Sequence, residues 1–311
     1  MAGVGRSSEH TFRVQTSLEP LTEQDSVDAV VTEQDSVGAV SATITEKSAL
    51  LHSLVAARRD VVVAFSGGAD SALLAWVAHQ ALGDHALAVT AVSPSLPADE
   101  LDHCRMLAET WGMAWRPVRT EELANPSYVA NDGDRCYWCK AELMDVVGPA
   151  ARQRNATVLL GVNVDDLGDH RPGQRAASER GAHFPLVEAG LTKADVRAMS
   201  RSFGLSTWDR PAAACLASRI PYGTPVSLRV LSRVERAEAA MRRLGFVELR
   251  VRHYGDTARI EVGEEELAHA LAERQAIVLA LRTAGYDYIT LDLEGLRSGN
   301  LNAALDPSRE T

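Results

Sequence analysis

The sequence predicts an α/β protein with a doubly wound parallel sheet, followed by a smaller α+β domain. Short apolar runs such as VVVAF (residues 61–65) and TVLLG (residues 157–161) are typical of parallel strands that are buried on both faces. Stretches long enough for helices alternate with these runs as far as about residue 203. After Ser227 the pattern changes to an amphipathic helix and then to strands that alternate between apolar and polar residues.

The first domain is expected to consist of helices and strands in alternation. We predict helices over residues 46–58, 72–82, 98–111, 139–153 and 193–203, and strands over residues 61–65, 86–93, 115–118 and 157–161. Because helices separate the strands, the strands should run parallel in one sheet. This domain covers residues 47–218.

The second domain covers residues 226–303 and follows the Pro/Gly-rich stretch 219–225. Its first helix ends at Gly245, and a hairpin with its turn at Gly255 and Asp256 comes next. In the first hairpin strand the alternation predicts one apolar and one polar face, with Val247, Leu249 and Val251 on the first and Glu248, Arg250 and Arg252 on the second. The second hairpin strand spans residues 258–262, and a helix over 264–284 and a strand over 288–293 complete the domain.

Residues 1–46 form a polar leader in which TEQDSVDAV and TEQDSVGAV repeat with a ten-residue period. Two copies are too few for a solenoid, which needs about three or more. We therefore expect a disordered leader, and we expect residues 304–311 to be a tail.

Composition excludes several classes of protein. The 311 residues carry a net charge of −10, which argues against a surface that wraps nucleic acid, because such binding depends on clustered cations. No apolar stretch approaches the ~18 residues of a membrane span, and the N-terminus lacks the apolar region of a secretory signal. We expect a cytoplasmic protein with no membrane partner, in which the four cysteines stay reduced.

The hexapeptide SGGADS (residues 66–71) lies between a predicted buried strand and a predicted helix. Gly67 and Gly68 permit backbone conformations closed to other residues, so that free N–H groups of the loop and of the helix start can surround an anion. Ser66 and Ser71 add hydroxyl donors, and Asp70 can hold a cation that offsets pyrophosphate charge. The alternative is a glycine-rich turn followed by a helix cap.

The full hexapeptide in this context resembles the loop of the PP-loop ATP pyrophosphatase superfamily, whose members adenylylate a substrate and release pyrophosphate. Neither GxxxxGK[ST] nor GxGxxG occurs, which disfavours a Walker A loop and a dinucleotide fold. In a nucleotide site of this kind, Ser93 would lie at the adenine edge. Gly161 would be a second contact, because ligands of open α/β sheets bind beyond the carboxyl ends of the strands.

Cys136 and Cys139 form a CxxC pair, and Cys215 lies in a separate segment. Cys104, in the middle of a predicted helix, is interpreted as a buried structural thiol. For the other three, the residues alone leave three interpretations open. They could hold an iron–sulfur cluster with one iron open to an exogenous ligand. They could form a zinc or redox site, or they could be unrelated thiols.

Seven motifs in order resemble the LarE family, the sulfur transferases that help build the nickel-pincer cofactor of lactate racemase. The resemblance runs from about Val61 to Asn302 and rests on AFSGGADS, RCYWCK, DHRPG, CLASRIPYGT, LRVRHY, ARIEV and LDLEGLRSGNLN. It implies a PP-loop, adenine nucleotide alpha hydrolase-like fold and an enzyme that uses ATP and Mg²⁺. It also implies that carboxylates of pyridinium-3,5-biscarboxylic acid mononucleotide are adenylylated and that a sulfur nucleophile then displaces AMP. Family members assemble as hexamers, which implies a homo-oligomer.

The resemblance also assigns roles to residues of the second domain. It implies that Glu238 and Glu261 bind a divalent cation and that Arg250 and Arg252 bind the phosphate or carboxylate of the mononucleotide, with Lys140 and Arg219 as further substrate contacts. Since Arg250 and Arg252 share one strand face, they can converge on one anion. Glu238 lies opposite the apolar stripe of its helix, so an ordinary exposed glutamate is the alternative.

The source of the sulfur is the point at which the family divides. Some members sacrifice a cysteine, but Ala214 occupies that position here, one residue before Cys215. Cys136, Cys139 and Cys215 instead match the cluster-bearing branch, which implies a [4Fe-4S] cluster and makes these cysteines and Asp70 the catalytic residues. Sacrifice of Cys215 stays open.

Three other functions compete with this interpretation. A PP-loop tRNA thiolase should have a basic RNA-binding surface. An amide-forming enzyme similar to NAD or GMP synthetase would have no use for the cysteines. A non-enzymatic module that binds ATP and carries a structural zinc would release no pyrophosphate.

Overall fold

The computed structural model describes residues 43–168, 172–210 and 214–297. The chain divides into two compact units, residues 1–45 and 46–311, and the fold below is that of the second. Residues 1–42 of the predicted leader over 1–46, the predicted tail, residues 298–303, and His170 and Arg171 of the DHRPG motif lie outside the described residues. Residues 43–46, which were also expected to be disordered, are helical, because the first helix begins at residue 43. The predicted division of the chain into domains at 47–218 and 226–303 stays a prediction.

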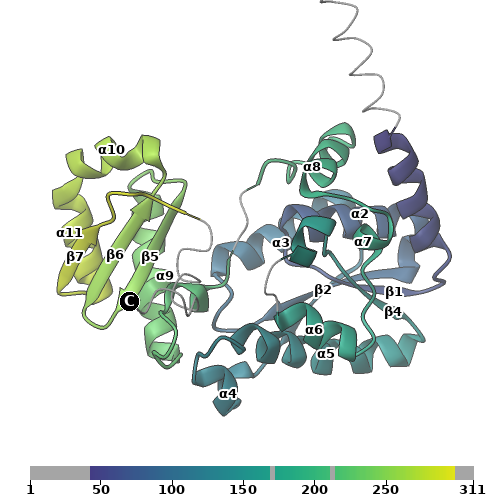
Figure 1. Ribbon diagram of the computed structural model, residues 1–311, viewed down its shortest axis with the longest axis horizontal. Coiled ribbons are helices and arrows are strands. Elements are labelled where there is room, and N and C mark those ends of the chain that lie inside the picture. Colours follow the sequence, from purple (N-terminus) through teal and green to yellow (C-terminus); the bar gives the residue numbers. More distant parts are fainter. Residues whose placement is uncertain (1–42, 169–171, 211–213, 298–311) are drawn as a thin grey trace, which may run out of the picture. The chain divides into compact units, whose positions relative to one another are not determined.

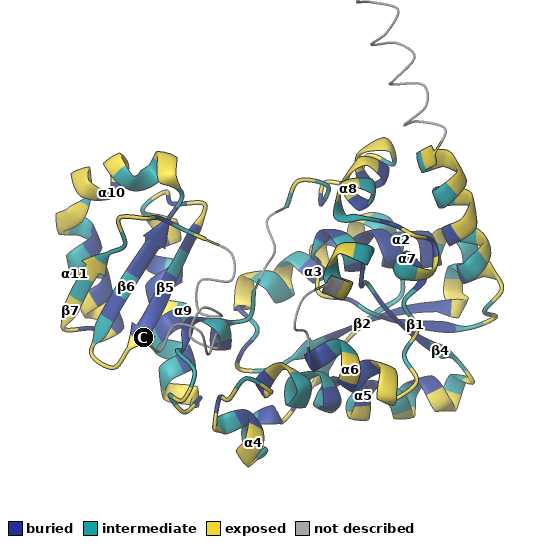
Figure 2. Cartoon of the chain, viewed as in Figure 1, coloured by how far each residue is buried: buried dark blue, intermediate teal, exposed yellow. Residues whose placement is uncertain are grey.

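Four parallel strands form the main sheet, which confirms the predicted α/β class (Figure 1). Their order is β3-β2-β1-β4, so the chain starts in the middle of the sheet and crosses over to both edges. The central strand VVVA is buried on both faces (Figure 2), as the apolar run predicts. The four strands are β1 (Val61–Ala64), β2 (Ala86–Val92), β3 (Trp115–Arg119) and β4 (Thr157–Leu160).

Helices cover both faces of this sheet (Figure 1). On one face, Leu143, Met144 and Val147 of α5 (Arg135–Arg154) pack with Val62 and Leu160 of the strands. The other face carries α2 (Ala69–Leu82), α3 (Ala98–Trp111), α7 (Pro185–Glu188) and α8 (Lys193–Ser202). The remaining helices of this part are 43–56, α4 (Pro126–Val129) and α6 (Pro172–Glu179). Within the described part of the chain, no helix combines the length and the apolar character that crossing a membrane requires.

Helix α5 begins four residues earlier than predicted, at Arg135 instead of Cys139. Asn131 adopts a left-handed conformation (φ 60°), and the N–H of Arg135 then bonds to the carbonyl of Asp132. This turn starts the helix ahead of the CxxC motif, so Cys136, which precedes the predicted helix, is helical as well. Both cysteines lie in the first helical turns.

A second sheet of three strands follows, with the order β5-β6-β7. The predicted hairpin is confirmed, since β5 (Leu249–Tyr254) and β6 (Thr257–Val262) pair antiparallel around Gly255, whose φ of 62° suits the turn. β7 (Tyr288–Leu291) pairs parallel with β6. The core beneath this sheet includes Met241 of α9 (Leu228–Arg243), Val251, Ile260 and Leu281.

Two details of this part differ from the prediction. Val247 is 79% exposed instead of facing the core, because a carboxylate of Glu266 accepts the N–H groups of Val247 and Glu248 and the strand starts only at Leu249. The predicted helix over 264–284 is interrupted, and the break lets Ala270 and Ile277 reach the same core. Its parts are a 3₁₀ turn (Glu264–Glu266), α10 (Leu267–Ala272) and α11 (Arg274–Ala284).

His253 on β5 should make stability depend on pH. It is 5% exposed, and its ring bonds to the hydroxyl of Tyr286. Burial and the neighbouring Arg233 lower its pKa, although Asp256 opposes them, so the folded state favours the neutral ring. Below the unfolded pKa of about 6.5 the unfolded chain binds the proton more readily, and stability is lost as the pH falls from there to the folded pKa.

The free energy of unfolding from denaturant titrations at pH 5 and pH 8 checks this. We expect the drop between the two pH values to be smaller in His253→Gln than in the parent, whereas substitution of the exposed His85 should leave the drop unchanged. Equal drops in the parent and in His253→Gln would contradict it.

Candidate active site

A pocket of about 1140 Å³ lies beyond the carboxyl ends of the parallel strands. Ser66 follows β1, Ser93 follows β2, Thr120 follows β3 and Gly161 follows β4, and all four line it. Binding at this edge is the rule in open α/β sheets. Because the volume exceeds the roughly 300–1,000 Å³ typical of single-ligand sites, there is room for a nucleotide and a second ligand.

The pocket wall brings together many of the predicted site residues from distant parts of the chain. They are Ser66, Ser71, Ser93, Cys136, Cys139, Lys140, Gly161, Cys215, Arg250 and Arg252. Gly67, Gly68, Asp70, Arg219, Glu238 and Glu261 are not part of this wall.

The SGGADS loop has the features of an anion site. Gly67 has a φ of 72°, which only glycine adopts easily, and Gly68 precedes α2 without a side-chain cap for the helix. The N-terminal N–H groups of α2 therefore lack a side-chain acceptor and can bind an anion. Ser71 holds the loop, since its hydroxyl donates to the carbonyl of Gly68 and accepts from the N–H of Ser66.

Gly161 allows β4 to approach this loop closely. A Cβ atom at Gly161 would lie 2.7 Å from the backbone nitrogen of Ser71 and 2.8 Å from the carbonyl carbon of Asp70. These are backbone atoms, which cannot move aside as a flexible side chain could. Gly161 thus has a steric role in the loop's position besides its place on the pocket wall.

Asp70 is held by two residues that the sequence analysis did not single out. Lys193 Nζ lies 2.6 Å from one carboxylate oxygen, and the amide of Asn163 donates to the other at 3.0 Å. Asn163 lies three residues beyond β4, a position at the functional edge of the sheet that could have drawn attention to it. Lys193 starts α8, and nothing in a single sequence shows its pairing with a residue 123 positions away.

The three proposed cluster ligands all line the pocket. Cys136 is exposed, and Cys139 and Cys215 are half-buried. Burial and the adjacent Cys215 raise the pKa of Cys139 to about 12. No three His, Cys, Asp or Glu side chains of the described residues are arranged so as to share one metal ion. Cys104 is fully buried, as predicted, and burial raises its pKa to about 11.

Arg135 ties the two cysteine-bearing segments together. Its guanidinium donates to the Asn131 side chain at 2.6 Å and to the Ala217 carbonyl at 2.9 Å, and it lies 4.0 Å from the sulfur of Cys136. Burial alone would lower the pKa of Arg135, but Cys215 and Cys136 raise it. A buried cation thus lies beside the thiols that line the pocket.

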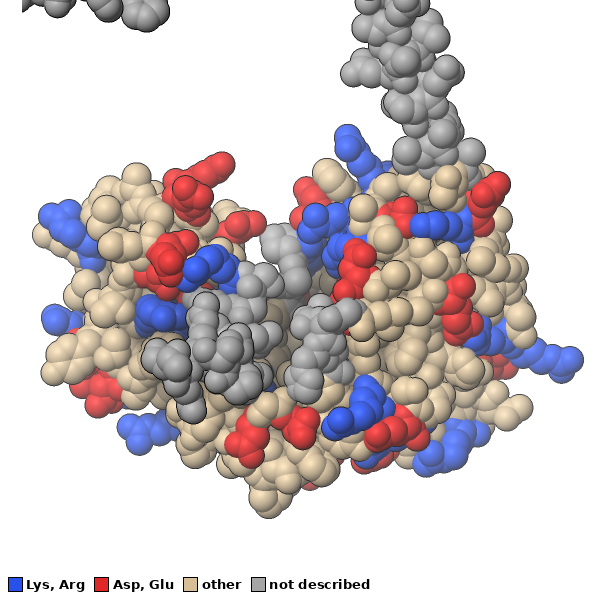
Figure 3. Space-filling view, viewed as in Figure 1, with Lys and Arg blue, Asp and Glu red and all other residues tan. Residues whose placement is uncertain are grey.

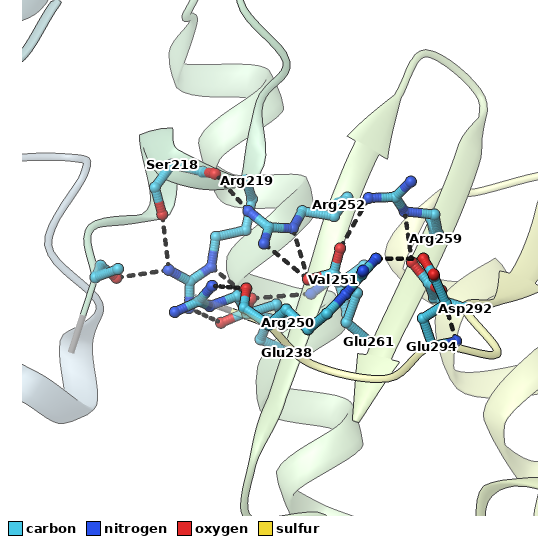
Figure 4. A network of polar contacts seen from close by, with 12 residues as sticks. Ser218, Arg219, Glu238, Arg250, Val251, Arg252, Arg259, Glu261, Asp292 and Glu294 are labelled. Carbon is cyan, nitrogen blue, oxygen red and sulfur yellow. Dashed lines mark hydrogen bonds and ion pairs between the residues drawn. The ribbon is translucent and has the colours of Figure 1, made fainter. Parts of the chain in front are cut away.

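Arg219 and Glu238 form a buried ion pair behind the wall. Glu238 is 0% exposed, so the alternative of an ordinary exposed helix glutamate is wrong. Its carboxylate accepts two bonds from Arg219, at 2.7 and 3.1 Å, and one from the N–H of Val251 (Figure 4). Arg219 also donates to the carbonyls of Ala214 and Cys215. All its donor nitrogens are engaged within the protein.

Glu261 is the shared partner of two arginines that face each other across the hairpin (Figure 4). Arg252 donates to one of its oxygens at 2.7 and 2.9 Å, and Arg259 donates to the other at 2.8 Å. Like charges opposite each other destabilise a strand pair, and this carboxylate offsets them. Arg250 is less engaged, with one bond to the Arg297 carbonyl. Burial, Arg252 and Arg219 lower its pKa, a sign of positive potential that an anion would relieve.

Gly161→Ala should destabilise the protein even without nucleotide. The added Cβ would collide with the backbone of Asp70 and Ser71, and overpacking of this kind costs about 1–3 kcal/mol. Denaturant titration of the nucleotide-free protein measures it. Gly263→Ala is the matched control, because its Cβ would meet atoms only at 3.5 Å or more. Equal unfolding free energies for the two variants would rule out the steric role.

Glu238→Gln should reduce the free energy of unfolding by about 3–5 kcal/mol, because it leaves the buried Arg219 without its counter-ion. Denaturant titration checks this, with Glu248→Gln as an exposed control. We expect a chelator to leave the stability of the parent protein unchanged. If the chelator destabilised the parent but not Glu238→Gln, Glu238 would be a metal ligand instead.

Comparison with known proteins places the chain in a family. The family model of NAD synthase matches residues 44–131, which include the SGGADS loop. The pyridinium-3,5-bisthiocarboxylic acid mononucleotide synthase of Lactiplantibacillus plantarum is 38% identical over 272 residues, which cover 85% of this chain and 96% of that synthase. An uncharacterized protein of Synechocystis is 45% identical over 247 residues, which cover 78% of this chain and 92% of the relative.

A third relative, an uncharacterized protein of Methanocaldococcus jannaschii, is 24% identical over 77% of this chain and 92% of its own length. The match to the synthase extends over most of both chains and confirms the resemblance inferred from the ordered motifs. The chain is therefore an enzyme of the LarE family, within the PP-loop superfamily.

Proposed function

We propose that the protein is an ATP-dependent sulfur transferase that converts carboxylates of pyridinium-3,5-biscarboxylic acid mononucleotide to thiocarboxylates. A carboxylate resists nucleophiles because its negative charge repels them. Transfer of AMP from ATP forms a mixed anhydride and releases pyrophosphate, which removes that charge and supplies a leaving group. A sulfur nucleophile then attacks the carbonyl carbon, and AMP departs. The name of the relative from Lactiplantibacillus plantarum supports this product.

The observation that carries the proposal is that one pocket joins three kinds of group. Ser66 and Ser71 come from the anion-binding loop, Cys136, Cys139 and Cys215 supply sulfur ligands, and Arg250 and Arg252 supply cations. An adenylylating sulfur transferase needs all three around one substrate carbonyl. We assign Arg250 and Lys140 to the substrate anions, since both line the pocket and Arg219 is engaged elsewhere.

The nucleotide half would use the loop and Asp70. The N-terminus of α2 and the Ser66 and Ser71 hydroxyls would bind the phosphates, Ser93 would contact the adenine edge, and Asp70 would hold Mg²⁺. Asp70 is paired with Lys193, whose ammonium group would be free to bind the phosphates when Asp70 holds the cation. Glu238 and Glu261 are better explained as counter-ions of Arg219, Arg252 and Arg259 than as metal ligands.

For the sulfur source, the donor set fits a [4Fe-4S] cluster. Three thiols line the pocket, and one of them, Cys136, lies beside the cation of Arg135. Burial together with Cys215 raises the pKa of Cys139, which a cationic centre would relieve. Cysteines of a cluster bind different iron atoms, so they need not converge on one ion. When bound, such a cluster would present sulfide at its open iron. Cys136, Cys139 and Cys215 would hold it, and Arg135 would orient the two segments that carry them.

A specific observation favours one alternative, amide formation with ammonia as in NAD synthase. The NAD synthase model matches residues 44–131. That segment ends before Cys136, however, and does not include Arg250 or Arg252. A tRNA thiolase is less well supported, because the net charge is −10 and acidic and basic side chains are interspersed on the face shown in Figure 3.

The test is an anaerobic assay of the protein reconstituted with iron and sulfide. Given ATP, Mg²⁺ and the biscarboxylate mononucleotide, we expect pyrophosphate, AMP and a product in which sulfur replaces carboxylate oxygen, detected by mass spectrometry. The triple variant Cys136→Ser, Cys139→Ser, Cys215→Ser should lose sulfur incorporation and keep pyrophosphate release. Cys104→Ser, which changes a buried thiol outside the pocket wall, is the control.

The same assay separates the alternatives. Full activity of the triple variant with ammonia would show amide formation, and dependence on tRNA would show a thiolase. If Cys215 lost the mass of one hydrogen sulfide after turnover, the sulfur would come from this cysteine and not from a cluster. Absence of pyrophosphate with every acceptor would contradict the proposal.

A further inference from the structure

Glu122 is a buried carboxylate on the wall of the active-site pocket that the proposed chemistry leaves without a role. It opens the 3₁₀ turn Glu122–Ala124, three residues beyond the end of β3. Its side chain is 2% exposed, and it lines the same pocket as Ser66, Cys139 and Arg250. The residue therefore lies at the functional edge of the sheet, at the carboxyl end of its edge strand.

One oxygen of Glu122 has no hydrogen-bond partner among the described residues. The contrast with the other buried carboxylates is clear, because Glu238 and Glu261 are each held by two arginines. Leaving a buried carboxylate oxygen without a partner is costly, and native proteins rarely do so without a functional reason. A ligand that brings a hydrogen-bond donor or a positive charge would complete this site.

Packing places Glu122 on the sulfur side of the pocket, because the next residue, Leu123, packs against the same apolar cluster as Cys139 and Cys215. Burial is the main cause of the raised pKa of Cys139 and of Tyr128, and the charge of Glu122 adds to it. Tyr128 cannot satisfy it, because its hydroxyl is engaged with Ser95. The cation of Arg135 is committed to Asn131 and Ala217.

The proposed substrate carries the charge that this site lacks. Its pyridinium ring has a permanent positive charge on the nitrogen, and its carboxylates and phosphate are negative. The pocket offers the complementary set, with one buried carboxylate at Glu122 and the cations Arg250 and Lys140. Because the sulfur must reach a carbonyl carbon attached to the ring, the ring has to lie beside the cysteines, where Glu122 is.

We propose that Glu122 is the counter-ion of the pyridinium ring and selects a positively charged ring over a neutral one. This inference rests on the proposed function for the identity of the substrate. Two other occupants are conceivable, the amino group of adenine and a divalent cation, and both are outcomes of the test. The adenine edge is assigned to Ser93, which follows a different strand.

The experiment compares binding of two probes that carry the same substituents on a charged and on a neutral ring. Nicotinic acid mononucleotide has a pyridinium ring with one carboxylate, and its dihydro form has the same groups on a neutral ring. Equilibrium dialysis without ATP gives both dissociation constants. We expect wild type to bind the charged form about 10- to 100-fold more tightly, the range for an interaction with a charged group.

Glu122→Gln keeps the shape and removes the charge, so it should abolish this preference and leave AMP affinity unchanged. Glu122→Asp keeps the charge and should retain part of the preference. Glu121→Gln makes the same charge change at the exposed neighbouring residue and should behave as wild type. Since an unpaired buried charge is removed, thermal melting of Glu122→Gln should show no loss of stability.

Three results would overturn the inference. The ring preference could survive in Glu122→Gln, the variant could lose AMP affinity instead, or it could lose Mn²⁺ binding measured by electron paramagnetic resonance. Turnover of the biscarboxylate mononucleotide tests the proposed function separately. A preference that depends on Glu122 without turnover would leave the inference standing and overturn the function, whereas turnover without the preference would do the reverse.

Discussion

The carboxylate of Glu238 is the constraint on which the second half of the active site depends. It is fully buried on α9, and it accepts bonds from Arg219 and from the backbone of Val251 on β5. Arg219 in turn donates to the carbonyls of Ala214 and Cys215. The charge of Glu238 therefore links helix α9, strand β5 and the turn that carries Cys215. Since breaking a buried ion pair costs several kcal/mol, their arrangement is held strongly.

Ion pairs also connect the arginines on one face of the second sheet. Arg250, Arg252 and Arg259 lie on one face, where Glu261 pairs with Arg252 and Arg259, and Asp292 pairs with Arg259 as well. The positive charge that is least compensated is that of Arg250, which has the fewest partners of the three. Glu122, which lies just beyond the end of β3, provides the opposite charge on the cysteine side of the pocket. A zwitterionic ligand is the class that matches both ends at once.

Much of the fold could be predicted because local patterns determine it. Apolar runs indicate the buried parallel strands, alternation of apolar and polar residues around Gly255 indicates the hairpin, and the SGGADS motif indicates an anion site. The boundaries of helices and strands were less predictable. The early start of α5 depends on the left-handed Asn131, and the start of β5 depends on bonds from the distant Glu266. Of the site, the residues on motifs could be named in advance, although the contacts of Arg135, which lies on RCYWCK, could not be predicted. The position of Asn163 just after a predicted strand was a weak signal, and nothing in the sequence indicated Lys193 or Glu122.

By itself, the sequence determined the class of fold, the nucleotide loop, the residue types of the site and the family. These depend on spacing along the chain, which a single sequence displays. Only the tertiary structure decided which charges are paired and which are left over. Glu238 and Glu122 are both glutamates in polar stretches, yet one is neutralised by Arg219 and the other has an oxygen without a partner among the described residues. The reason is physical: the cost of a buried charge depends on what lies within a few ångströms of it, and folding brings those neighbours together from distant positions.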